Sequence, residues 1–464
     1  MKAQRKTERG LSCPPTTEPG LSSPGNDGLE NPSSVIETEI GSYPSSWRVD
    51  RFDSLFAVQQ GRQVSKANRQ GDNQKPFLRT KNVFWGKLDL EDLDEMHFSA
   101  SDEARLTLKR GDLLICEGGS IGRTAVWKGQ LAVCYYQNHL HRARLKNDDA
   151  DSSYALFWLW YAFEVGSVYF GRGNVTTIPN LSQSKLCELP LPVPPLPEQQ
   201  KIAAVLGVVQ RAMEQQERLL ALTAELKKTL LHQLFTQGLR HEPQKQTDIG
   251  PVPESWEVVK LGELCQIKHG FAFAGEFFQP QGRYILLTPG HYHEDGGFRD
   301  QGQKTKYYTG DFPTSYILNK DDLLVVMTEQ KEGLLGSSLL VPRGELYLHN
   351  QRLGLIQDLD ETRLRRRFLY HLFNTPPVRK RISMTASGSK VRHTSPGKIR
   401  DTVVALPPIA HQEHAVEVLD AVDRKLDTAT RKHATLTALF RTLLHELMTA
   451  KTRVHELELP VAKS

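Results

Sequence analysis

The 464-residue sequence lacks long apolar runs and closely spaced cysteines. Its longest apolar runs are far shorter than the ~20 residues that a membrane-spanning helix needs. The basic start (Lys2, Arg5, Lys6) leads into LSCPPTTEPG, which is not the apolar core of a signal peptide. The five cysteines form no C-x-x-C pair, which argues against a disulfide framework or a cysteine zinc site. We therefore expect a soluble cytoplasmic protein with reduced thiols.

The motifs of nucleotide hydrolysis and DNA methylation are also missing. The GK pairs at Gly86 and Gly397 lack the upstream glycine and the following hydroxyl of a phosphate-binding loop. An amino-directed DNA methyltransferase needs a [DNS]-P-P-[YFW] loop to hold the extruded base. The nearest string is NTPPV (residues 374–378), which has an extra threonine and no aromatic residue. We interpret it as a turn after a helix.

One string leaves a nuclease open as an alternative. Asp322, Glu329 and Lys331 imitate the two carboxylates and the lysine with which metal-dependent nucleases hold Mg²⁺ and orient water. So loose a pattern often arises by chance. In the first half of the chain, Glu117 has no lysine beside it. We therefore prefer a strand that enters a polar loop.

Histidine pairs occur twice but do not complete a metal site. His139 with His141, and His291 with His293, could each present two imidazoles on one face of a strand. Neither pair has a cysteine or a third ligand at metal spacing. No metal site is predicted.

Basic residues are concentrated in two stretches, although the net charge is only +5. Residues 363–400 hold 11 Lys or Arg and no acidic residue. Residues 62–81 hold six basic residues and one aspartate. Two basic surfaces in a nearly balanced chain favour a polyanionic partner, with DNA or RNA the first candidate.

The chain is an internal duplication. The segment LLHQLFT (230–236) returns as LLHELMT (443–449), and residues 194–236 align with 407–449 without a gap. Upstream, YPSSW ending at Trp47 matches VPESW ending at Trp256, and KRGDLLI (109–115) matches NKDDLLV (319–325). A repeat of this size indicates that one structural unit occurs twice.

The repeated segments have the periodicity of paired helices. Apolar residues at alternating spacings of three and four are typical of a narrow coiled-coil stripe. The second stripe comprises Leu419, Val422, Leu426, Ala429, His433, Leu436, Phe440, Leu443 and Leu447. The first comprises Leu206, Val209, Met213, Gln216, Leu220, Thr223, Leu230 and Leu234, with Lys227 interrupting it. A helix of this length would extend for ~65 Å.

The segments between these helices mix short β-like runs with turns and short helices. We therefore predict a mixed α/β fold in which two similar globular α/β domains are separated by two long antiparallel coiled-coil helices, with an internal pseudo-twofold repeat. The expected boundaries are a disordered extension at 1–40, a domain at 41–190, a helix at 191–240, a domain at 251–404 and a helix at 405–455. Residues 1–40 are rich in Pro, Ser, Gly, Thr and Glu, which is the basis for expecting disorder there.

Several motifs are similar to those of a known family. LPVPPLPEQQKIAAVL (191–206), the P-x-S-W entry to each domain and the K-x-D-L-L string resemble the DNA-specificity subunit of type I restriction-modification enzymes. The second half adds YILLTPGHY (284–292), YILNKDDLLVVMTE (316–329), GLLGSSLLVP (333–342) and YLHNQRLGLI (347–356). The resemblance covers about residues 41–455. It weakens at LPPIAHQEHAV (406–416), where HQE replaces EQQ.

This resemblance implies that each globular domain is a target-recognition domain that reads one half of a bipartite site in double-stranded DNA. It also implies that the paired helices set the spacing and dock two methyltransferase subunits, to which two restriction (translocase) subunits can add. The chain itself would have no catalytic activity, no cofactor and no membrane contact. The partner subunits would use S-adenosylmethionine, with ATP and Mg²⁺ if a nuclease subunit is present.

Candidate DNA contacts are polar and basic residues in predicted loops, because such side chains bind phosphates and base edges. In the first half they are Arg79, Lys81, Asn82, Ser120, Arg123, Asn138, His139, Asn174 and Thr176. In the second half they are Asn350, Gln351, Arg352, Ser389, Lys390, Arg392 and His393. Besides the nuclease, the remaining alternative is a coiled-coil adaptor that makes no contact with DNA.

Overall fold

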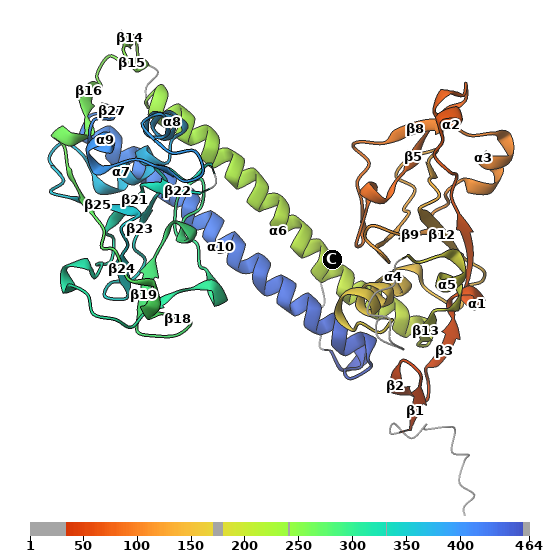
Figure 1. The fold of residues 1–464 in the computed structure, drawn as a ribbon. Helices are drawn as coiled ribbons and strands as arrows, with labels where there is room; N and C mark the ends of the chain where they lie inside the picture. The colour runs from red at the N-terminus through yellow and green to blue at the C-terminus, as the bar shows by residue number, and fades with distance from the viewer. Residues whose placement is uncertain (1–33, 170–179, 240–241, 331, 458–464) are drawn as a thin grey trace, which may run out of the picture. The chain divides into compact units, whose positions relative to one another are not determined.

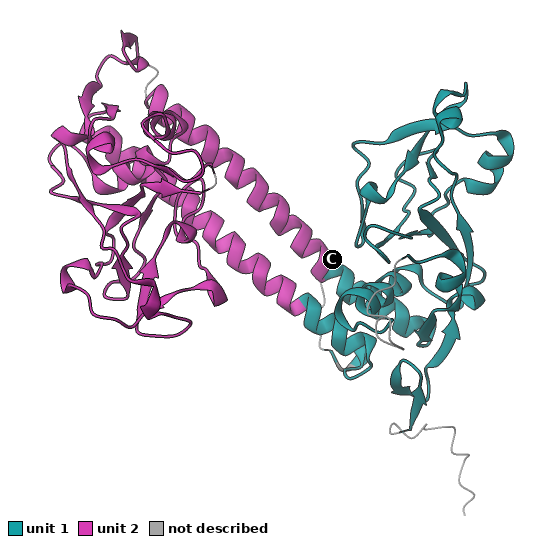
Figure 2. Ribbon diagram, in the orientation of Figure 1, with its two compact units in different colours: residues 1–208, 440–464 teal, residues 209–439 magenta. Residues whose placement is uncertain are grey.

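A computed structural model describes residues 34–169, 180–239, 242–330 and 332–457 (Figure 1). The chain divides into two compact units (Figure 2). Unit 1 contains residues 1–208 and 440–464, and unit 2 contains residues 209–439. Each unit combines one globular α/β domain with parts of both long helices. No helix in the described part of the chain has the length and apolar character needed to cross a membrane.

The domain of unit 1 is built on two small sheets. An antiparallel four-stranded sheet has the order β10-β9-β12-β4, and a three-stranded sheet has the order β11-β5-β8. Strands β5 and β11 are parallel. The strands are β4 (Phe56–Gln60), β5 (Gln74–Leu78), β8 (Asp94–His97), β9 (Leu113–Cys116), β10 (Thr124–Val126), β11 (Tyr135–Tyr136) and β12 (Leu140–Leu145).

The domain of unit 2 repeats this topology. Its antiparallel sheet has the order β17-β25-β21-β23, and its second sheet, β18-β20-β19-β24, again has one parallel pair, β19 with β24. The strands are β17 (Gln266–His269), β18 (Phe278–Gln279), β19 (Tyr284–Leu287), β20 (Tyr307–Tyr308), β21 (Leu323–Val326), β23 (Ser338–Leu340), β24 (Tyr347–His349) and β25 (Leu353–Gln357). The predicted mixed α/β class and the internal repeat are confirmed.

The matching strings RGDLL (110–114) and KDDLL (320–324) lead into an inner strand of the four-stranded sheet in each domain. The leucines are buried in β9 and β21, where they contribute to the core. Asp112 is 1% exposed, and its carboxylate accepts hydrogen bonds from the Lys109 backbone N–H and from Arg144, both at 2.7 Å. Asp322 likewise accepts from the Asn319 backbone N–H at 2.8 Å. The aspartate therefore closes the turn that enters the strand, which is a structural role in both halves.

The repeat begins earlier than expected. Residues 1–33 lie outside the described residues, but β1 (Val35–Thr38), inside the segment predicted to be disordered, pairs with β2 (Gly41–Pro44). The same hairpin recurs as β14 (Gln244–Thr247) and β15 (Gly250–Pro253). In each turn, a threonine hydroxyl donates to a glycine carbonyl at 2.6 Å, within the matching strings TEIG (38–41) and TDIG (247–250). That short match was the available sequence signal.

The two long helices, α6 (Leu196–Thr236) and α10 (Ile409–Met448), pack against each other. Within unit 2, Lys227 pairs with Asp423 at 2.7 Å, and Glu217 pairs with His433 at 3.2 Å. Because the α6 partner moves backward along the chain as the α10 partner moves forward, the helices are antiparallel. At 1.5 Å per residue, the 41 residues of α6 extend for about 61 Å.

The predicted stripe on each long helix faces the other long helix. The seam residues Gln216, Thr223 and Ala429 are buried, at 7%, 4% and 3% exposure. Lys227, which interrupts the apolar pattern, is the residue that forms the ion pair with Asp423. A charged pair within the seam favours one register over its alternatives, as polar residues do in coiled coils.

A buried glutamine joins each domain to the start of the long helix that follows it. Gln199 Nε2 donates to the carbonyls of Pro194 and Asp149, at 2.8 and 3.1 Å. Its Oε1 accepts from the Asp151 backbone N–H at 2.8 Å, at the N-cap of α4 (Ser152–Trp160). All three bonds tie α6 to unit 1.

Gln412 forms the same contacts in unit 2. Its Nε2 donates to the carbonyls of Pro407 and Arg363, at 2.9 and 2.8 Å. Its Oε1 accepts from the Arg365 backbone N–H at 2.9 Å, at the N-cap of α7 (Arg366–Phe373). Gln199 and Gln412 are both fully buried. The repeated glutamine is thus a structural clamp.

Each domain also packs on the end of the other long helix. In unit 1, the Phe440 ring on α10 lies 4.7 Å from the Trp160 ring on α4. In unit 2, the Phe235 ring on α6 is stacked 4.8 Å from the Phe368 ring on α7. Each long helix is therefore anchored at its start by a glutamine clamp and near its end by an aromatic contact.

The second long helix has HQE (411–413) where the first has EQQ (198–200), and this difference changes the second junction. In unit 1, Glu198 accepts from the Trp47 indole N–H at 3.2 Å and from Arg453 at 2.8 Å. The position equivalent to Glu198 is His411. Among the described residues, the buried Trp256 indole N–H has no hydrogen-bond partner. The second junction consequently lacks the carboxylate of the first.

Replacing Gln412 with alanine should lower the free energy of unfolding by about 2–4 kcal/mol, because three backbone groups at the junction lose their partner. Denaturant unfolding followed by circular dichroism measures this loss. The matched control is Gln210→Ala on α6, since that side chain donates its hydrogen bond to Glu214, one turn away on the same helix. Equal stability of the two variants would contradict the clamp.

Candidate nucleic-acid interface

A tight turn between β24 and β25 forms the centre of the candidate site in unit 2. Asn350 Oδ1 accepts from the Arg352 backbone N–H at 2.9 Å, which fixes the turn. Phe271 clamps it from the side, donating its N–H to the His349 carbonyl and accepting from the Gln351 N–H, both at 2.9 Å. The Arg352 carbonyl accepts from the Met327 N–H at 2.9 Å.

The turn between β11 and β12 in unit 1 has the same backbone connections. Arg62 donates its N–H to the Tyr136 carbonyl at 3.1 Å and accepts from the Asn138 N–H at 2.9 Å. The His139 carbonyl accepts from the Glu117 N–H at 3.0 Å. Asn138 therefore corresponds in structure to Gln351, and His139 corresponds to Arg352.

A glycine allows the close approach in both domains. A Cβ atom on Gly270 would lie 2.0 Å from the Asn350 carbonyl oxygen, and one on Gly61 would lie 2.3 Å from the Gln137 carbonyl oxygen. Both distances are far below van der Waals contact, so only glycine fits there.

Further loops reach the same end of each sheet. The Met327 carbonyl accepts from the Thr394 N–H at 2.9 Å, and the Glu117 carbonyl accepts from the Leu181 N–H at 2.7 Å. These bonds bring the segments before α9 (Pro396–Arg400) and α5 (Gln183–Glu188) beside the turns. Loops grouped on a rigid sheet edge are well suited to recognition.

Several predicted residues have available side chains at this end. Gln351, Arg352, Ser389 and Lys390 are exposed. His393 is also exposed, next to the residue that bonds to Met327.

In unit 1, His139 is exposed, and its Nδ1 lies 3.5 Å from Glu117. The Arg123 guanidinium lies 5.4 Å from the centre of the exposed Phe84 ring. Ser120 and Asn138 are half-buried. The loop after β9 and the β11–β12 turn thus bring these four predicted residues to one sheet end.

Other predicted residues support the structure. Arg79 pairs with Asp94 at 2.6 Å, and Lys81 pairs with Asp92 at 2.7 Å. Asn82 is 1% exposed, and its amide holds the surrounding loop through the Asp89 and Asp92 carbonyls.

In unit 2, Arg392 bonds to Glu329 and Ser383, and Asn350 is 8% exposed and shapes its own turn. Asn174 and Thr176 lie outside the described residues. The predicted set therefore includes both exposed side chains and residues already engaged in the fold.

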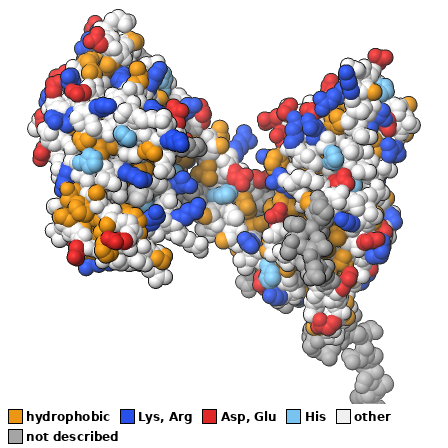
Figure 3. Space-filling view, in the orientation of Figure 1, with side chains coloured by type: hydrophobic (Ala, Val, Ile, Leu, Met, Phe, Trp, Pro, Cys, Tyr) orange, Lys and Arg blue, Asp and Glu red, His pale blue; other side chains and the backbone are white. Residues whose placement is uncertain are grey.

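The basic stretch 363–400 is not the uniformly basic surface that its composition suggested. Arg363 pairs with Glu257, Arg365 with Glu413 and Arg367 with Asp420, at 2.7–2.9 Å. Burial lowers the pKa of Arg379 to about 10, and its guanidinium donates to backbone carbonyls. Accordingly, Lys and Arg side chains are interspersed with acidic ones on the face shown in Figure 3. Glu257, Glu413 and Asp420 all lie outside residues 363–400 in the sequence, and folding brings them to this stretch.

The nuclease alternative fails on geometry. Glu329 is 3% exposed, and its Oε2 accepts from the backbone N–H groups of Gly333, Leu334 and Leu335, at 2.7–3.0 Å. Asp322 lies before β21 and Glu329 lies beyond it, so the strand separates them by roughly 13 Å. They cannot share a metal ion. Lys331 lies outside the described residues.

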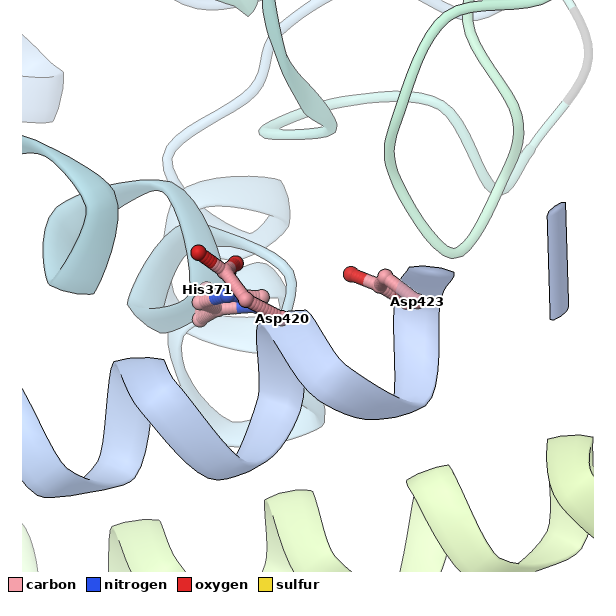
Figure 4. A group of neighbouring side chains, drawn as sticks. All are labelled: His371, Asp420 and Asp423. Atoms are coloured by element: carbon pink, nitrogen blue, oxygen red, sulfur yellow. Dashed lines mark hydrogen bonds and ion pairs between the residues drawn. The ribbon is translucent and has the colours of Figure 1, made fainter. Parts of the chain in front are cut away.

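One cluster has the composition of a metal site but is already neutralised. Figure 4 shows Asp420 and Asp423 on α10, with His371 beside Asp420. Arg367 and His371 bond to Asp420 at 2.7 and 3.2 Å, and Lys227 pairs with Asp423. Burial by itself raises the pKa of Asp420, but these bonds outweigh it and lower the pKa to about 2. The cluster is an ion-pair network that joins α7 and α10.

The chain is similar to known proteins over most of its length. The family model for the type I restriction modification DNA specificity domain matches residues 44–224 and 253–438, which together are most of the chain. The chain belongs to this family. It is 22% identical to the type I restriction enzyme MjaVIII specificity subunit of Methanocaldococcus jannaschii over 433 residues, covering 89% of this chain and 95% of that one. It is 28% identical to the EcoBI specificity subunit of Escherichia coli over 179 residues, 38% of this chain and 34% of that one.

Two solved structures share the fold. The S subunit of a type I restriction-modification system from M. genitalium matches with a TM-score of 0.56 at 18% identity, covering 86% of this chain and 96% of that one. A chain from a structural study of complex assembly and conformational transition of the type I R-M system matches with a TM-score of 0.50 at 15% identity, covering 88% and 99%.

The chain is thus a DNA-specificity subunit of a type I restriction-modification system with two target-recognition domains. Specificity subunits are non-catalytic parts of the complex and carry no cofactor of their own. The predicted membership of this family and the predicted role as a DNA-specificity subunit are confirmed.

Sequence reasoning missed two features of the site. Glu117, considered only as a nuclease ligand, lies beside His139 at the sheet end. The turn from Thr288 to His291 follows β19 as the Arg79–Asn82 turn follows β5. Only residues of the Arg79–Asn82 turn were predicted to contact DNA. The offset of 209 that relates Trp47 to Trp256 also relates these two turns, and it was the signal available.

Replacing Gly270 with alanine should displace the Asn350–Arg352 turn and lower the free energy of unfolding by about 1–3 kcal/mol, because the new methyl group meets a backbone carbonyl. Thermal melting measures the stability, and footprinting measures the loss of contact at one half-site. Gly275→Ala is the matched control, since a Cβ atom there meets nothing within 4 Å. A Gly270→Ala protein with the same melting point and footprint as the control would refute the close-packing argument.

Proposed function

We propose that each target-recognition domain reads one half of a bipartite site in double-stranded DNA, with the domains extending over residues 41–190 and 251–404. The observation that carries the proposal is the pair of matching turns. Their backbones are held by the same hydrogen bonds, yet they carry Asn138 and His139 in one domain and Gln351 and Arg352 in the other. One scaffold with two sets of polar side chains suits two different sequences.

Two readers on one chain explain how a short recognition set becomes selective. A wrong base pair costs ~1–3 kcal/mol, so a domain that reads a few base pairs cannot by itself reject most genomic sites. When both domains are on one stiff chain, the second contact becomes effectively intramolecular and the two costs act together.

We further propose that α6 and α10 set the distance between the half-sites and dock two methyltransferase subunits. Their antiparallel seam and the partly buried Lys227–Asp423 pair support the role as a spacer. Docking is supported by leucines that face away from the seam: Leu226 is 49% exposed, and Leu439, its counterpart in the repeat, is 44% exposed. Equivalent apolar positions on both helices suit two copies of one partner.

The remaining partners follow from the family. Methyltransferase subunits would bring S-adenosylmethionine, and restriction subunits would bring ATP and Mg²⁺ chemistry, to a chain that acts on chromosomal DNA in the cytoplasm. The adaptor alternative, in which the chain does not touch DNA, predicts no DNA affinity even at low salt. DNA binding by the proposed interface should instead weaken steeply as salt rises, because phosphate contacts release counterions.

The test is to map methylated adenines in DNA from cells that express the methyltransferase subunit with or without this chain. We expect one split motif, with two fixed half-sites and a constant gap, only when the chain is present. A methyltransferase expressed with an unrelated specificity subunit is the control, and it should give a different motif. Methylation that is absent, or that is identical without this chain, would rule out the proposal.

A further inference from the structure

The two turns differ in chemistry at one equivalent position. The carbonyls of His139 and Arg352 each accept from the first residue after an inner strand, β9 or β21, which is Glu117 in unit 1 and Met327 in unit 2. This bond defines the equivalence independently of any sequence alignment. Position 139 carries an imidazole with 61% of the side chain exposed, whereas position 352 carries an exposed guanidinium.

The residue behind each side chain is also different. Glu117 is 14% exposed, and its Oε2 lies 3.5 Å from His139 Nδ1 and 3.4 Å from Gln60 Nε2. Met327, at the same place in unit 2, is 1% exposed and apolar. The first domain thus presents a carboxylate and an imidazole where the second presents only a cation.

Both positions sit on rigid backbone. Gly61 and Gly270 hold the turns at close approach, and Asn350 Oδ1 holds the Arg352 backbone N–H. A side chain presented from a fixed backbone loses less entropy when it binds. Arginine donates in a fixed fork that matches O6 and N7 of guanine in the major groove, whereas a carboxylate accepts from an exocyclic amine.

We infer that Arg352 and the Glu117–His139 pair are specificity-determining groups of the two half-sites. Arg352 selects a guanine in the half-site of the second domain. Glu117, positioned beside His139, selects a base that offers an exocyclic amine, cytosine or adenine, in the other half-site. Phosphates repel a carboxylate, so Glu117 makes a favourable DNA contact only with a base donor. This inference rests on the proposed bipartite reading.

The test uses the full chain with its methyltransferase subunit and a DNA library randomised across both half-sites. Arg352→Ala should relax one G·C pair of a single half-site, lowering discrimination there by on the order of 10- to 100-fold. The other half-site should be unchanged. Glu117→Met, which creates the side chain found at the equivalent position 327, should relax one position of the opposite half-site only.

Arg343→Ala is the matched control, because Arg343 is exposed beyond β23 at the opposite end of the same sheet. It should leave both half-sites unchanged. Glu117→Gln, nearly isosteric with the native residue, replaces Glu117→Met if thermal melting shows that the latter is unfolded. It should alter the same position.

Three results separate the possibilities. If Arg352→Ala slows methylation equally on every sequence, Arg352 contacts a phosphate and the inference fails. If the Arg352 and Glu117 variants all retain the wild-type motif and its selectivity, the inference also fails while bipartite reading stands. If the wild-type complex shows no split motif, the proposed function itself fails.

Discussion

The antiparallel pairing of α6 and α10 is the constraint on which the remaining structure depends. Each long helix begins immediately after one domain and packs near its end against the other domain. Both contacts can form only if the two helices run in opposite directions. An apolar stripe alone would tolerate several registers. The Lys227–Asp423 and Glu217–His433 pairs favour one, because shifting the helices by a turn would leave a partly buried lysine without its carboxylate.

The two junctions between a domain and the long helix that follows it are built in the same way. Gln199 and Gln412 make matching sets of three hydrogen bonds, so the duplicated helix starts are joined to the duplicated domains in the same way. Divergence between the halves is greater away from these clamps. His411 stands where the first half has Glu198, the partner of Trp47, and the turn residues at the sheet ends differ almost completely. A frame shared by both halves, with loops that differ, allows one fold to recognise different sequences.

Much of this architecture could be predicted from the sequence. Spacings of three and four residues predicted the paired helices, since the seam must repeat at that period, and the gapless alignment of 43 residues predicted the repeat. The predicted seam includes Gln216, Thr223 and Ala429, all of which are buried. Disorder at residues 35–38 was predicted from composition alone, and the structure instead places a strand there.

The details of the site were harder to predict, because they depend on partners distant in sequence. The charge count predicted a basic surface at residues 363–400, but folding brings acids such as Glu257 and Glu413 to it, and these neutralise part of its charge. Glu329 looked like a metal ligand until the fold placed three backbone N–H groups around it. Likewise, Asn82 and Asn350 are residues of a type that often contacts DNA, but their side chains form hydrogen bonds within their own loops. Sequence patterns identify which loops matter, whereas hydrogen bonding decides which side chains in them are available.

The central claim is that the helix pair acts as a stiff spacer. The most direct measurement is the methylation rate of the full complex on DNA in which the gap between the two half-sites is varied one base pair at a time. Each added pair moves the second half-site by about 3.4 Å and rotates it by about 34°. A stiff spacer predicts one sharp maximum, with the rate falling at least tenfold when the gap changes by one or two pairs. A rate that stays constant across the series would contradict the account.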